Sequence, residues 1–235
     1  AQLGGQVGDT LTIVVIDAAG NTSTAASTTL SVLPPDPTIV APTINRTVAT
    51  DIFTATAFLY SGTTPIQTGV APGTIERRRA AVARGQVSQR DGTPLSGVTI
   101  AVLSHPEFGQ TVSRVDGKFD LVVNGGGPLT FTYTYTKAGY LSAQRQVDTP
   151  WRDYALLPDV VLIALDSQVT PIDLTATTPI QVARGSVVTD SDGTRQATLL
   201  FPQGTTAQMV LPDGSAQPLT TLHVRATEYT IGANG

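Results

Sequence analysis

The chain has 235 residues, a formal net charge of −4 and no cysteine. The lack of cysteine excludes disulfides, thiolate catalysis and cysteine-based metal sites, and the small negative charge gives no attraction to nucleic acid. Only 14% of the residues are charged, and the 22 glycines and 16 prolines favour strands and turns over helices. No apolar stretch approaches the roughly 20 residues that a membrane-spanning helix needs. We therefore expect an all-β chain that has no membrane span.

The first expected element is a hairpin within residues 1–33. A strand at 11–17 (LTIVVID) and a Thr-rich strand that ends at Leu33 flank a short turn. The hairpin resembles the last one of bacterial immunoglobulin-like repeats, and a whole sandwich of that type needs about 100 residues. Asp17 and Asn21 could bind Ca²⁺ at the turn. Since calcium takes six to eight oxygen ligands, we expect these two side chains to stabilise the turn instead.

Residues 34–80 are expected to be a linker, because three prolines within 34–37 cannot continue a sheet. Inside it, residues 52–59 (IFTATAFL) are largely apolar at both odd and even positions, which predicts a strand covered on both faces. Residues 74–83 would form a short helical turn or extend into the next strand. They contain the run Arg77-Arg78-Arg79, which we expect to be a solvated face, with contact to an acidic partner as the alternative.

The stretch at residues 84–123 has the clearest strand pattern. Every second residue is apolar in two runs, which is the period of half-buried strands. The two runs are Val98, Ile100 and Val102, alternating with Thr99, Ala101 and Leu103, and Phe119, Leu121 and Val123, alternating with Lys118, Asp120 and Val122. Asp91-Gly92 and Asp116-Gly117 predict tight turns, because such turns need a positive φ.

Two further strands are predicted in the same region. Leu129, Phe131, Tyr133 and Tyr135 alternate with threonines, and residues 160–165 are apolar throughout, which predicts a central strand that closes the sheet. Trp151 precedes this strand. It could stack on a sugar, but we expect it to plug one end of the sandwich, since it is the only tryptophan.

The motif G-x-V-x-x-x-D-G-x-P-L-x-G-V-x-I, followed by R-x-D-G-x-F-x-L, resembles the transthyretin-like, carboxypeptidase-regulatory-like β-sandwich. The turn at Lys137-Ala138-Gly139-Tyr140 resembles a turn of the same modules. The resemblance implies one such sandwich over residues 81–165. It also implies a scaffold or adhesion role rather than an enzyme.

Residues 166–235 begin a further β unit, which we expect to be incomplete. Strands are predicted at 180–188, 196–201 and 208–211, with turns between them. At 221–229, Leu222, Val224 and Ala226 should face inward, and His223, Arg225 and Thr227 outward. The pattern faintly resembles ZU5-like sandwiches.

No group of residues predicts catalysis, a cofactor or a metal. Asp190 and Asp192 start like a calcium loop, but no glutamate follows at the twelfth position, so a turn is expected. The two histidines share no motif, and the glutamates lack the arrangement of a glycosidase. An isopeptide bond needs a lysine on a core strand, whereas both lysines are at predicted turns. The histidines are His105 and His223, the glutamates are Glu76, Glu107 and Glu228, and the lysines are Lys118 and Lys137.

Taken as a series, residues 40–235 resemble the region before the repeat shell of bacterial Rhs (YD-repeat) proteins, which are teneurin-like. The resemblance implies a large bacterial protein, secreted or at the cell surface, whose shell encloses a C-terminal effector. The β modules would present, brace or plug that shell. Their partner would be the rest of the same polypeptide or neighbouring subunits through strand pairing, and not nucleic acid.

Two alternatives stay open. The sandwiches could be an adhesin stalk or fibre component assembled through strand pairing. They could also be a regulatory β-sandwich fused to an enzyme.

Overall fold

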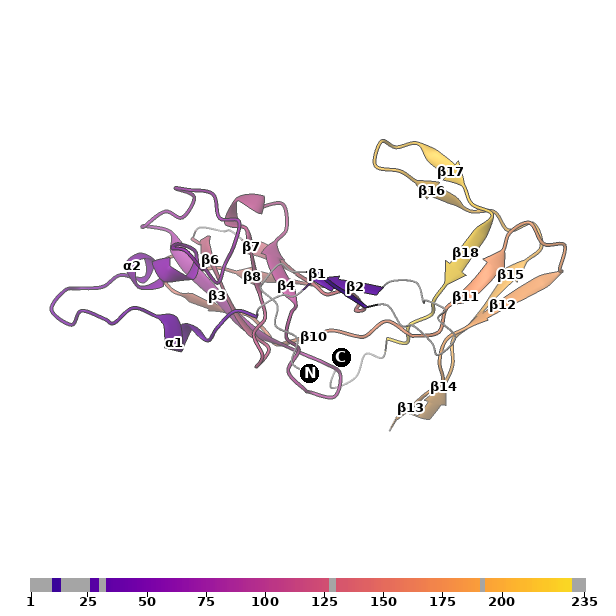
Figure 1. Cartoon of the computed structure of the whole chain (residues 1–235), viewed down its shortest axis with the longest axis horizontal. Helices are drawn as coiled ribbons and strands as arrows, with labels where there is room; N and C mark the ends of the chain where they lie inside the picture. The colour runs from indigo at the N-terminus through magenta and orange to yellow at the C-terminus, as the bar shows by residue number, and fades with distance from the viewer. Residues whose placement is uncertain (1–9, 14–25, 30–32, 127–129, 191–192, 230–235) are drawn as a thin grey trace.

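The computed structural model describes residues 10–13, 26–29, 33–126, 130–190 and 193–229. Only 8% of the structure is helical, and the rest consists of strands and their connections. The expected all-β class is therefore confirmed. Figure 1 shows a two-layered body from the central region and, at the other end of the long axis, several separate hairpins from the C-terminal region.

The N-terminal hairpin is described only in part. Strand β1 (Thr10–Ile13) pairs antiparallel with β2 (Ala26–Thr29); β1 begins one residue before the first predicted strand, and β2 lies within the second. Asp17 and Asn21 lie outside the described residues, as do Leu129 and Asp192. The interpretations placed on these four residues remain predictions.

The central region forms a sandwich of two four-stranded sheets. In the first sheet, β3 pairs antiparallel with β6 on one side and parallel with the short strands β9 and β10 on the other. The second sheet has the order β5-β4-β7-β8 and is antiparallel throughout. The first sheet comprises β3 (Ala80–Ser88), β6 (Lys118–Asn124), β9 (Tyr154–Leu156) and β10 (Val160–Val161). The second comprises β4 (Thr99–Val102), β5 (Gln110–Val112), β7 (Thr130–Thr136) and β8 (Ala143–Asp148).

Apolar side chains from both sheets meet in the core, as the alternation predicted. Ile100 and Tyr135 from the second sheet and Phe119 from the first are almost fully buried. The rings of Phe119 and Tyr135 lie edge to face with their centres 5.8 Å apart. Phe119 also lies over Gly85, where an added Cβ would come within 2.9 Å of the ring. Glycine at this position therefore allows the ring to reach the core. Phe131 is also buried.

The two predicted Asp-Gly turns are confirmed. Gly92 and Gly117 have φ angles of 81° and 75°, a region that glycine adopts without steric cost. The Asp91 carboxylate accepts the backbone N–H of Thr93 at 2.9 Å and so closes the first turn on itself.

Strand β6 is buried on both faces, although its alternation predicted one solvated face. Asp120 and Val122 are fully buried and Asn124 nearly so. Residues 51–76, from the expected linker, cover this outer face. Their apolar side chains Leu59, Ile66 and Ile75 belong to the same core cluster as β6. The prediction that one face of β6 is solvated was wrong, because the residues that cover this face come from a distant segment of the chain.

The predicted strand at residues 52–59 was also wrong, since this segment is helical. Helix α2 (Ile52–Thr56) is followed by a 3₁₀ turn, η1 (Ala57–Leu59). The Asp51 side chain accepts the N–H of Thr54 at 2.8 Å, which is a helix N-cap. A second short helix, α1 (Pro37–Val40), starts at Asp36 in the same way, with proline in its first turn.

The closing strand predicted at residues 160–165 was wrong in length and position. Only Val160–Val161 forms a strand, and it lies at the sheet edge beside β3 rather than in the centre. Trp151 does not plug the sandwich either. Its side chain is 63% exposed and lies over Gly126, where a Cβ would come within 2.9 Å of it.

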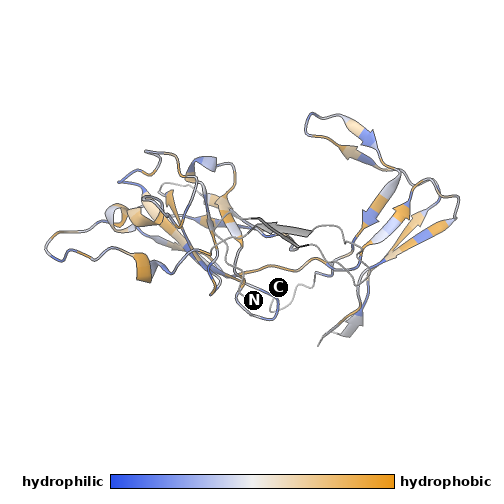
Figure 2. Ribbon diagram, viewed as in Figure 1, coloured by the Kyte–Doolittle hydropathy of each residue, from blue (hydrophilic) through white to orange (hydrophobic). Residues whose placement is uncertain are grey.

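The C-terminal unit consists of two-stranded hairpins and ladders. They are β11 (Thr170–Asp173) with β18 (Thr221–Val224), β12 (Ile180–Arg184) with β15 (Thr198–Pro202), β13 (Val188–Asp190) with β14 (Gly193–Arg195), and β16 (Gln208–Val210) with β17 (Ala216–Pro218). The predicted strand at 180–188 is broken after Arg184. Within residues 166–229 as described, Ile172 and Ala183 are the buried apolar side chains. Figure 2 shows apolar residues along these open hairpins, and the exposed ones are Ile180, Val182, Val187, Leu199, Leu200, Met209 and Val210.

The inward and outward pattern predicted for residues 221–229 agrees with burial up to Ala226 but was wrong for Thr227, which is half-buried and accepts the N–H of Asp166. Leu222 and Val224 are half-buried, whereas His223 and Arg225 are exposed. In β18 itself the partner of His223 is Pro171.

Candidate functional site: the junction between two β units

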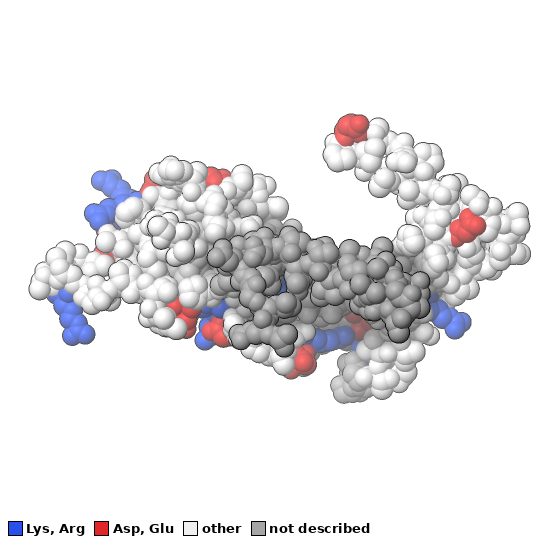
Figure 3. All heavy atoms as spheres, in the orientation of Figure 1, with Lys and Arg blue, Asp and Glu red and all other residues white. Residues whose placement is uncertain are grey.

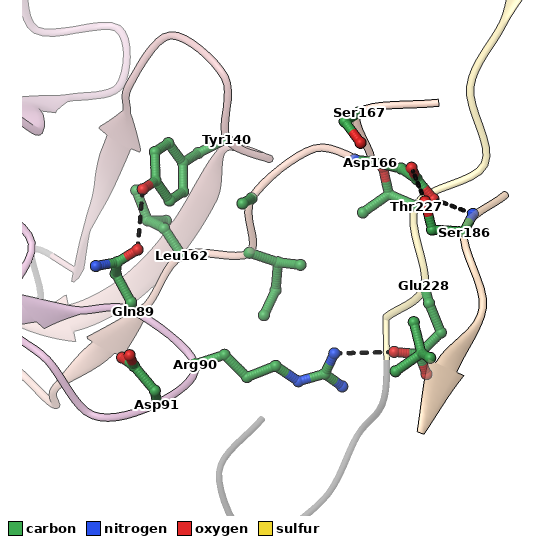
Figure 4. A pocket seen from close by; sticks show the side chains of 13 residues that line it. Gln89, Arg90, Asp91, Tyr140, Leu162, Asp166, Ser167, Ser186, Thr227 and Glu228 are labelled. Atoms are coloured by element: carbon green, nitrogen blue, oxygen red, sulfur yellow. Dashed lines mark hydrogen bonds and ion pairs between the residues drawn. The ribbon is translucent and has the colours of Figure 1, made fainter. Parts of the chain in front are cut away.

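The sandwich and the C-terminal unit meet around a cavity of about 430 Å³. The sandwich contributes the turn after β3, residues 89–91, together with Tyr140 and Leu162. The C-terminal unit contributes Ser186, Val188 and the segment after β18. Figure 4 shows side chains from both units facing one another across this space.

A carboxylate at this junction bridges two arginines. Glu228 Oε2 accepts from Arg90 Nη1 at 2.9 Å, and Glu228 Oε1 accepts from Arg195 Nε at 2.8 Å. Arg90 belongs to the sandwich, whereas Glu228 and Arg195 belong to the C-terminal unit. The Glu228 side chain is only 19% exposed. Because both carboxylate oxygens have charged donors, this contact is stronger than an isolated surface ion pair.

A second contact fixes the connection between the units. The Asp166 carboxylate accepts the N–H of Ser186 at 2.6 Å, its hydroxyl at 2.7 Å and the N–H of Gln168 at 2.8 Å. The Asp166 N–H donates to Thr227 Oγ1 at 3.0 Å. The hydrogen bonds from Gln168 and Ser186 hold the pKa of Asp166 below its ordinary value, because they stabilise the charged form.

Gly185 makes this contact possible. A Cβ at this position would lie 2.5 Å from the Ala226 carbonyl oxygen and 3.2 Å from Asp166 Oδ2. Glycine therefore allows the backbones of two segments to approach closely beside the Asp166 carboxylate.

On the sandwich side, Tyr140 joins two connections of the body. Its hydroxyl donates to Gln89 Oε1 at 3.1 Å, next to Arg90. The backbone N–H of Leu141 donates to the carbonyl of Ile163 at 2.8 Å. The turn that carries Arg90 and the segment that leads to Asp166 are thus both attached to the sandwich through the segment 140–141.

A buried ion network lies on the outer face of the first sheet, since Asp120 alternates along β6 with the inward-facing Phe119 and Leu121. Asp120 is fully buried and accepts from Arg84 Nε at 2.6 Å and from Arg114 Nη1 at 2.7 Å. Arg84 also lies over the Tyr154 ring, 4.9 Å from its centre. Sequence reasoning missed this network. The available signal was a charged residue, Asp120, inside an apolar strand.

The residues weighed as catalytic candidates are dispersed. His105 Nδ1 lies 2.9 Å from Glu107 Oε1, and the imidazole packs against Phe108 and Phe131. Lys137 Nζ donates to the carbonyl of Ser96 at 2.9 Å. The remaining ones take the following places: Glu76 beside Arg79, Lys118 at the start of β6, His223 on β18, Asp190 at the end of β13 and Glu228 at the junction.

The arginine run has local partners. Arg77 Nε lies 3.1 Å from Asp51, and its guanidinium packs on Phe53, so it secures the start of α2. Arg79 Nε donates to the carbonyl of Gly125. The side chain of Arg77 is 64% exposed, so the face is solvated as expected but also attaches residues 51–56 to the sandwich.

In the described part of the chain, no three His, Asp or Glu side chains are grouped so as to hold a metal ion. None of the described helices has the length and apolar character needed to cross a membrane.

Residues 75–162 match a family model described as the teneurin TTR-like domain. Teneurin-1 of Gallus gallus is 40% identical over 111 residues, which is 46% of this chain and 4% of that protein. Teneurin-3 of Mus musculus is 33% identical over 133 residues, 56% of this chain and 5% of that protein. Teneurin-m of Drosophila melanogaster is 35% identical over 95 residues, 40% of this chain and 3% of that protein.

Residues 75–162 of the sandwich are thus similar to the teneurin TTR-like domain. The family match ends at Leu162, before Asp166 and the C-terminal unit. The chain spans only a few per cent of the length of these relatives, 4% of teneurin-1 and 5% of teneurin-3.

Likeness to solved structures is low. Hydroxyquinol 1,2-dioxygenase from Pseudomonas putida DLL-E4 has a TM-score of 0.32 and 12% identity, covering 39% of this chain and 58% of that one. At this score the likeness supports no conclusion about function.

Proposed function

We propose that this chain is a non-enzymatic structural module of a large extracellular protein. In this role the transthyretin-like domain and the C-terminal unit together brace or plug a shell of YD repeats elsewhere in the same polypeptide. The teneurin-type match of the sandwich supports a structural or interaction module of a large surface protein.

The observation that carries the proposal is the junction. A brace has to transmit force between its ends, so its parts must keep a fixed relation. Glu228 joins Arg90 of one unit to Arg195 of the other, and Asp166 holds the connecting segment. These contacts use charged and backbone groups of both units.

The C-terminal unit supplies the surface for the proposed partner. An isolated hairpin is marginal in water, and its stability needs a covering layer. On β12 and β15, Ile180, Val182 and Leu200 lie on one exposed face, since Val182 is directly opposite Leu200. Charged side chains are sparse on the visible face of this unit (Figure 3), so the contact would be mainly apolar.

The location of the protein and the kind of larger protein to which it belongs are also part of the proposal. A cell-surface or secreted location and a bacterial Rhs protein rest on the sequence resemblance, whereas the relatives named above come from animals.

A site-specific photo-crosslinker in the full-length protein tests this role. Placed at Leu200, it should give cross-links to the repeat shell. The matched control is Gln203, which is also exposed but lies beyond the end of β15. Cross-links from both positions at equal yield, or from neither, would contradict the docking of this face on the shell.

A further inference from the structure

Three edges of the sandwich are protected. The edge of β6 is covered by Gln67, whose Nε2 donates to the Val122 carbonyl at 2.8 Å while its Oε1 accepts the Val122 N–H at 2.7 Å. The edge of β5 is paired with Thr68 through two backbone hydrogen bonds to Gln110. The edge formed by β9 and β10 consists of strands of three and two residues with Pro158 between them. Short, interrupted edges resist further pairing.

The fourth edge, β8, is different. It is a regular strand of six residues, and no described residue forms a strand on its outer side. It pairs with β7 over its whole length, from Thr130 opposite Asp148 to Tyr135 opposite Ala143. Such an edge offers a row of backbone donors and acceptors to another strand.

The structure also identifies which backbone groups are free. The N–H of Leu103 donates to the carbonyl of Thr132 at 2.8 Å, so Thr132 points its backbone groups toward β4. Since these groups alternate along an antiparallel strand, Tyr133 points toward β8 and bonds with its partner Arg145. The groups of the alternate residues on β8 therefore point outward. These residues are Gln144, Gln146 and Asp148.

One side chain agrees with this assignment. Arg145 Nη1 donates to the carbonyl of Gln144 at 2.8 Å, which it can reach because that carbonyl does not face β7. Strand pairing would exchange this exposed hydrogen bond for a backbone one.

We propose that β8 pairs antiparallel with β8 of a second copy of this chain, centred on Gln146. In this register Gln146 lies opposite Gln146 of the second copy, and Gln144 lies opposite Asp148, so amides meet an amide or a carboxylate. Arg145 lies opposite Val147. A register centred on Arg145 would instead place two arginines face to face, which is unfavourable. The sheet β5-β4-β7-β8 of one copy and the same sheet of the second copy then form one continuous sheet.

The identity of the occupant follows from this self-complementarity. A two-fold axis repeats every contact, and the outward residues of β8 pair with themselves without a like-charge contact. This inference concerns the sandwich alone and goes beyond the proposed bracing role. Strand pairing at β8 can be disproved without affecting the junction contacts, and the bracing role can be disproved without affecting strand pairing.

Amide hydrogen exchange in the 235-residue chain, followed by NMR at rising protein concentration, tests the pairing. The amides of Gln144, Gln146 and Asp148 should exchange fast in dilute solution and slow down as the dimer forms. Arg145 and Val147 are internal controls, because their amides face β7 and should be slow throughout. Sedimentation velocity measures the dimer in the same samples.

Three outcomes overturn the proposal. Outward amides that stay fast while a dimer forms would place the contact elsewhere. Outward amides that are slow at every concentration would mean that another part of the same chain occupies the edge. A chain that remains monomeric with fast outward amides up to millimolar concentration also contradicts it.

Variants at Gln146 provide the second measurement. Gln146→Pro removes an outward N–H and leaves the hydrogen bonds to β7 intact. Both copies in the dimer carry the substitution, so two hydrogen bonds are lost and association should weaken about tenfold or more. Gln146→Thr keeps the N–H and should associate like the parent chain. Circular dichroism melting verifies that both variants are folded. Equal association of the two variants would overturn backbone pairing at this edge.

Discussion

Asp120 shows how a single side chain organises the outer face of the first sheet. It is fully buried between Arg84 and Arg114, which come from the neighbouring strand and from the turn before β6. A buried carboxylate without such partners would be costly to desolvate, so the two guanidiniums and Asp120 depend on one another. The side chain of Arg114 is itself only 9% exposed.

Asp120→Asn should therefore destabilise the sandwich strongly. The amide keeps the shape of the side chain but removes the charge bonded to Arg114, which then has only the longer contact of its Nε with Asp116 at 3.7 Å, so a loss of about 3–5 kcal/mol is expected. Urea denaturation measures the change in the free energy of unfolding. Asp116→Asn is the control: Asp116 is 43% exposed and an asparagine can still accept in the turn, so about 0.5 kcal/mol or less is expected.

Tyr133 gives a prediction about alkaline pH. Burial raises its pKa to about 12, although a hydrogen bond with Thr149 lowers it somewhat. A pKa raised on folding means that the neutral form is favoured in the native state. The contribution to stability is complete below the ordinary value of 10.0 and is lost as the pH rises through about 12.

Absorbance of tyrosinate during alkaline titration tests this. A late step near pH 12 should be present in the native chain, reduced in Tyr133→Phe, where Tyr135 keeps a pKa raised by burial, and shifted to about 10 in urea. A native chain whose tyrosines all titrate together near 10 would contradict the buried environment of Tyr133.

At the scale of elements, residues 51–76 act as a further layer of the sandwich. They cover the outer face of the first sheet with α2 and η1, and they close the β6 edge with side-chain amides. Gln67 serves as a substitute for a neighbouring strand, because it both donates to and accepts from Val122. Asn124 does the converse and binds the backbone of Thr74 and Glu76 at 2.7 and 2.8 Å.

Gln67→Leu should test the importance of this cover. Leucine has a similar volume but leaves the N–H and carbonyl of Val122 and the carbonyl of Phe108 without partners. Each buried, unsatisfied group costs about 1–3 kcal/mol, so the three together predict a loss of about 3–9 kcal/mol in urea denaturation. Gln203→Leu, at an exposed position, should change stability by about 0.5 kcal/mol or less. Equal effects of the two variants would mean that Gln67 is not part of the folded edge.

The strands of the second sheet could be predicted from sequence because one face is buried and the other is not. In β4 and β7 the period of two is visible in Ile100, Val102, Tyr133 and Tyr135. The same reasoning failed for residues 52–59, since an apolar segment without periodicity fits a covered strand and a short helix equally well. The deciding signal was Asp51, which caps the helix three residues before Thr54.

The junction and the contact of Gln67 with Val122 could not be predicted because their partners are distant in sequence. Arg90 and Glu228 are 138 positions apart, and Gln67 and Val122 are 55 apart. No local pattern encodes such contacts. Only the fold brings them together, and Glu228 had been considered merely as one of several dispersed carboxylates.

At the scale of the whole molecule, few contacts between described residues link the two β units. Glu228, its two arginines and Asp166 hold the units together (Figure 4), while most of the C-terminal hairpins extend away from the sandwich (Figure 1).

Glu228→Gln should therefore loosen the molecule without unfolding the sandwich. Small-angle X-ray scattering should show a larger radius of gyration and a broader distance distribution, because the neutral amide binds the two guanidiniums weakly. High salt should produce part of the same change in the parent chain. Asp213→Asn, in the turn between β16 and β17, is the control and should scatter like the parent. If Glu228→Gln is also unchanged, the ion pair does not set the orientation.

The position of Gln67 along the chain has a consequence for biosynthesis. The ribosome releases residues 59–76 before it has made β6, so the side chain that protects this edge is already present when the edge forms. A nascent chain then has little opportunity to expose β6 to another unfinished copy, which is a common origin of misassembly in β proteins. In a circular permutant that moved this segment to the end, β6 would emerge unprotected, and aggregation during refolding should rise although the finished fold is the same.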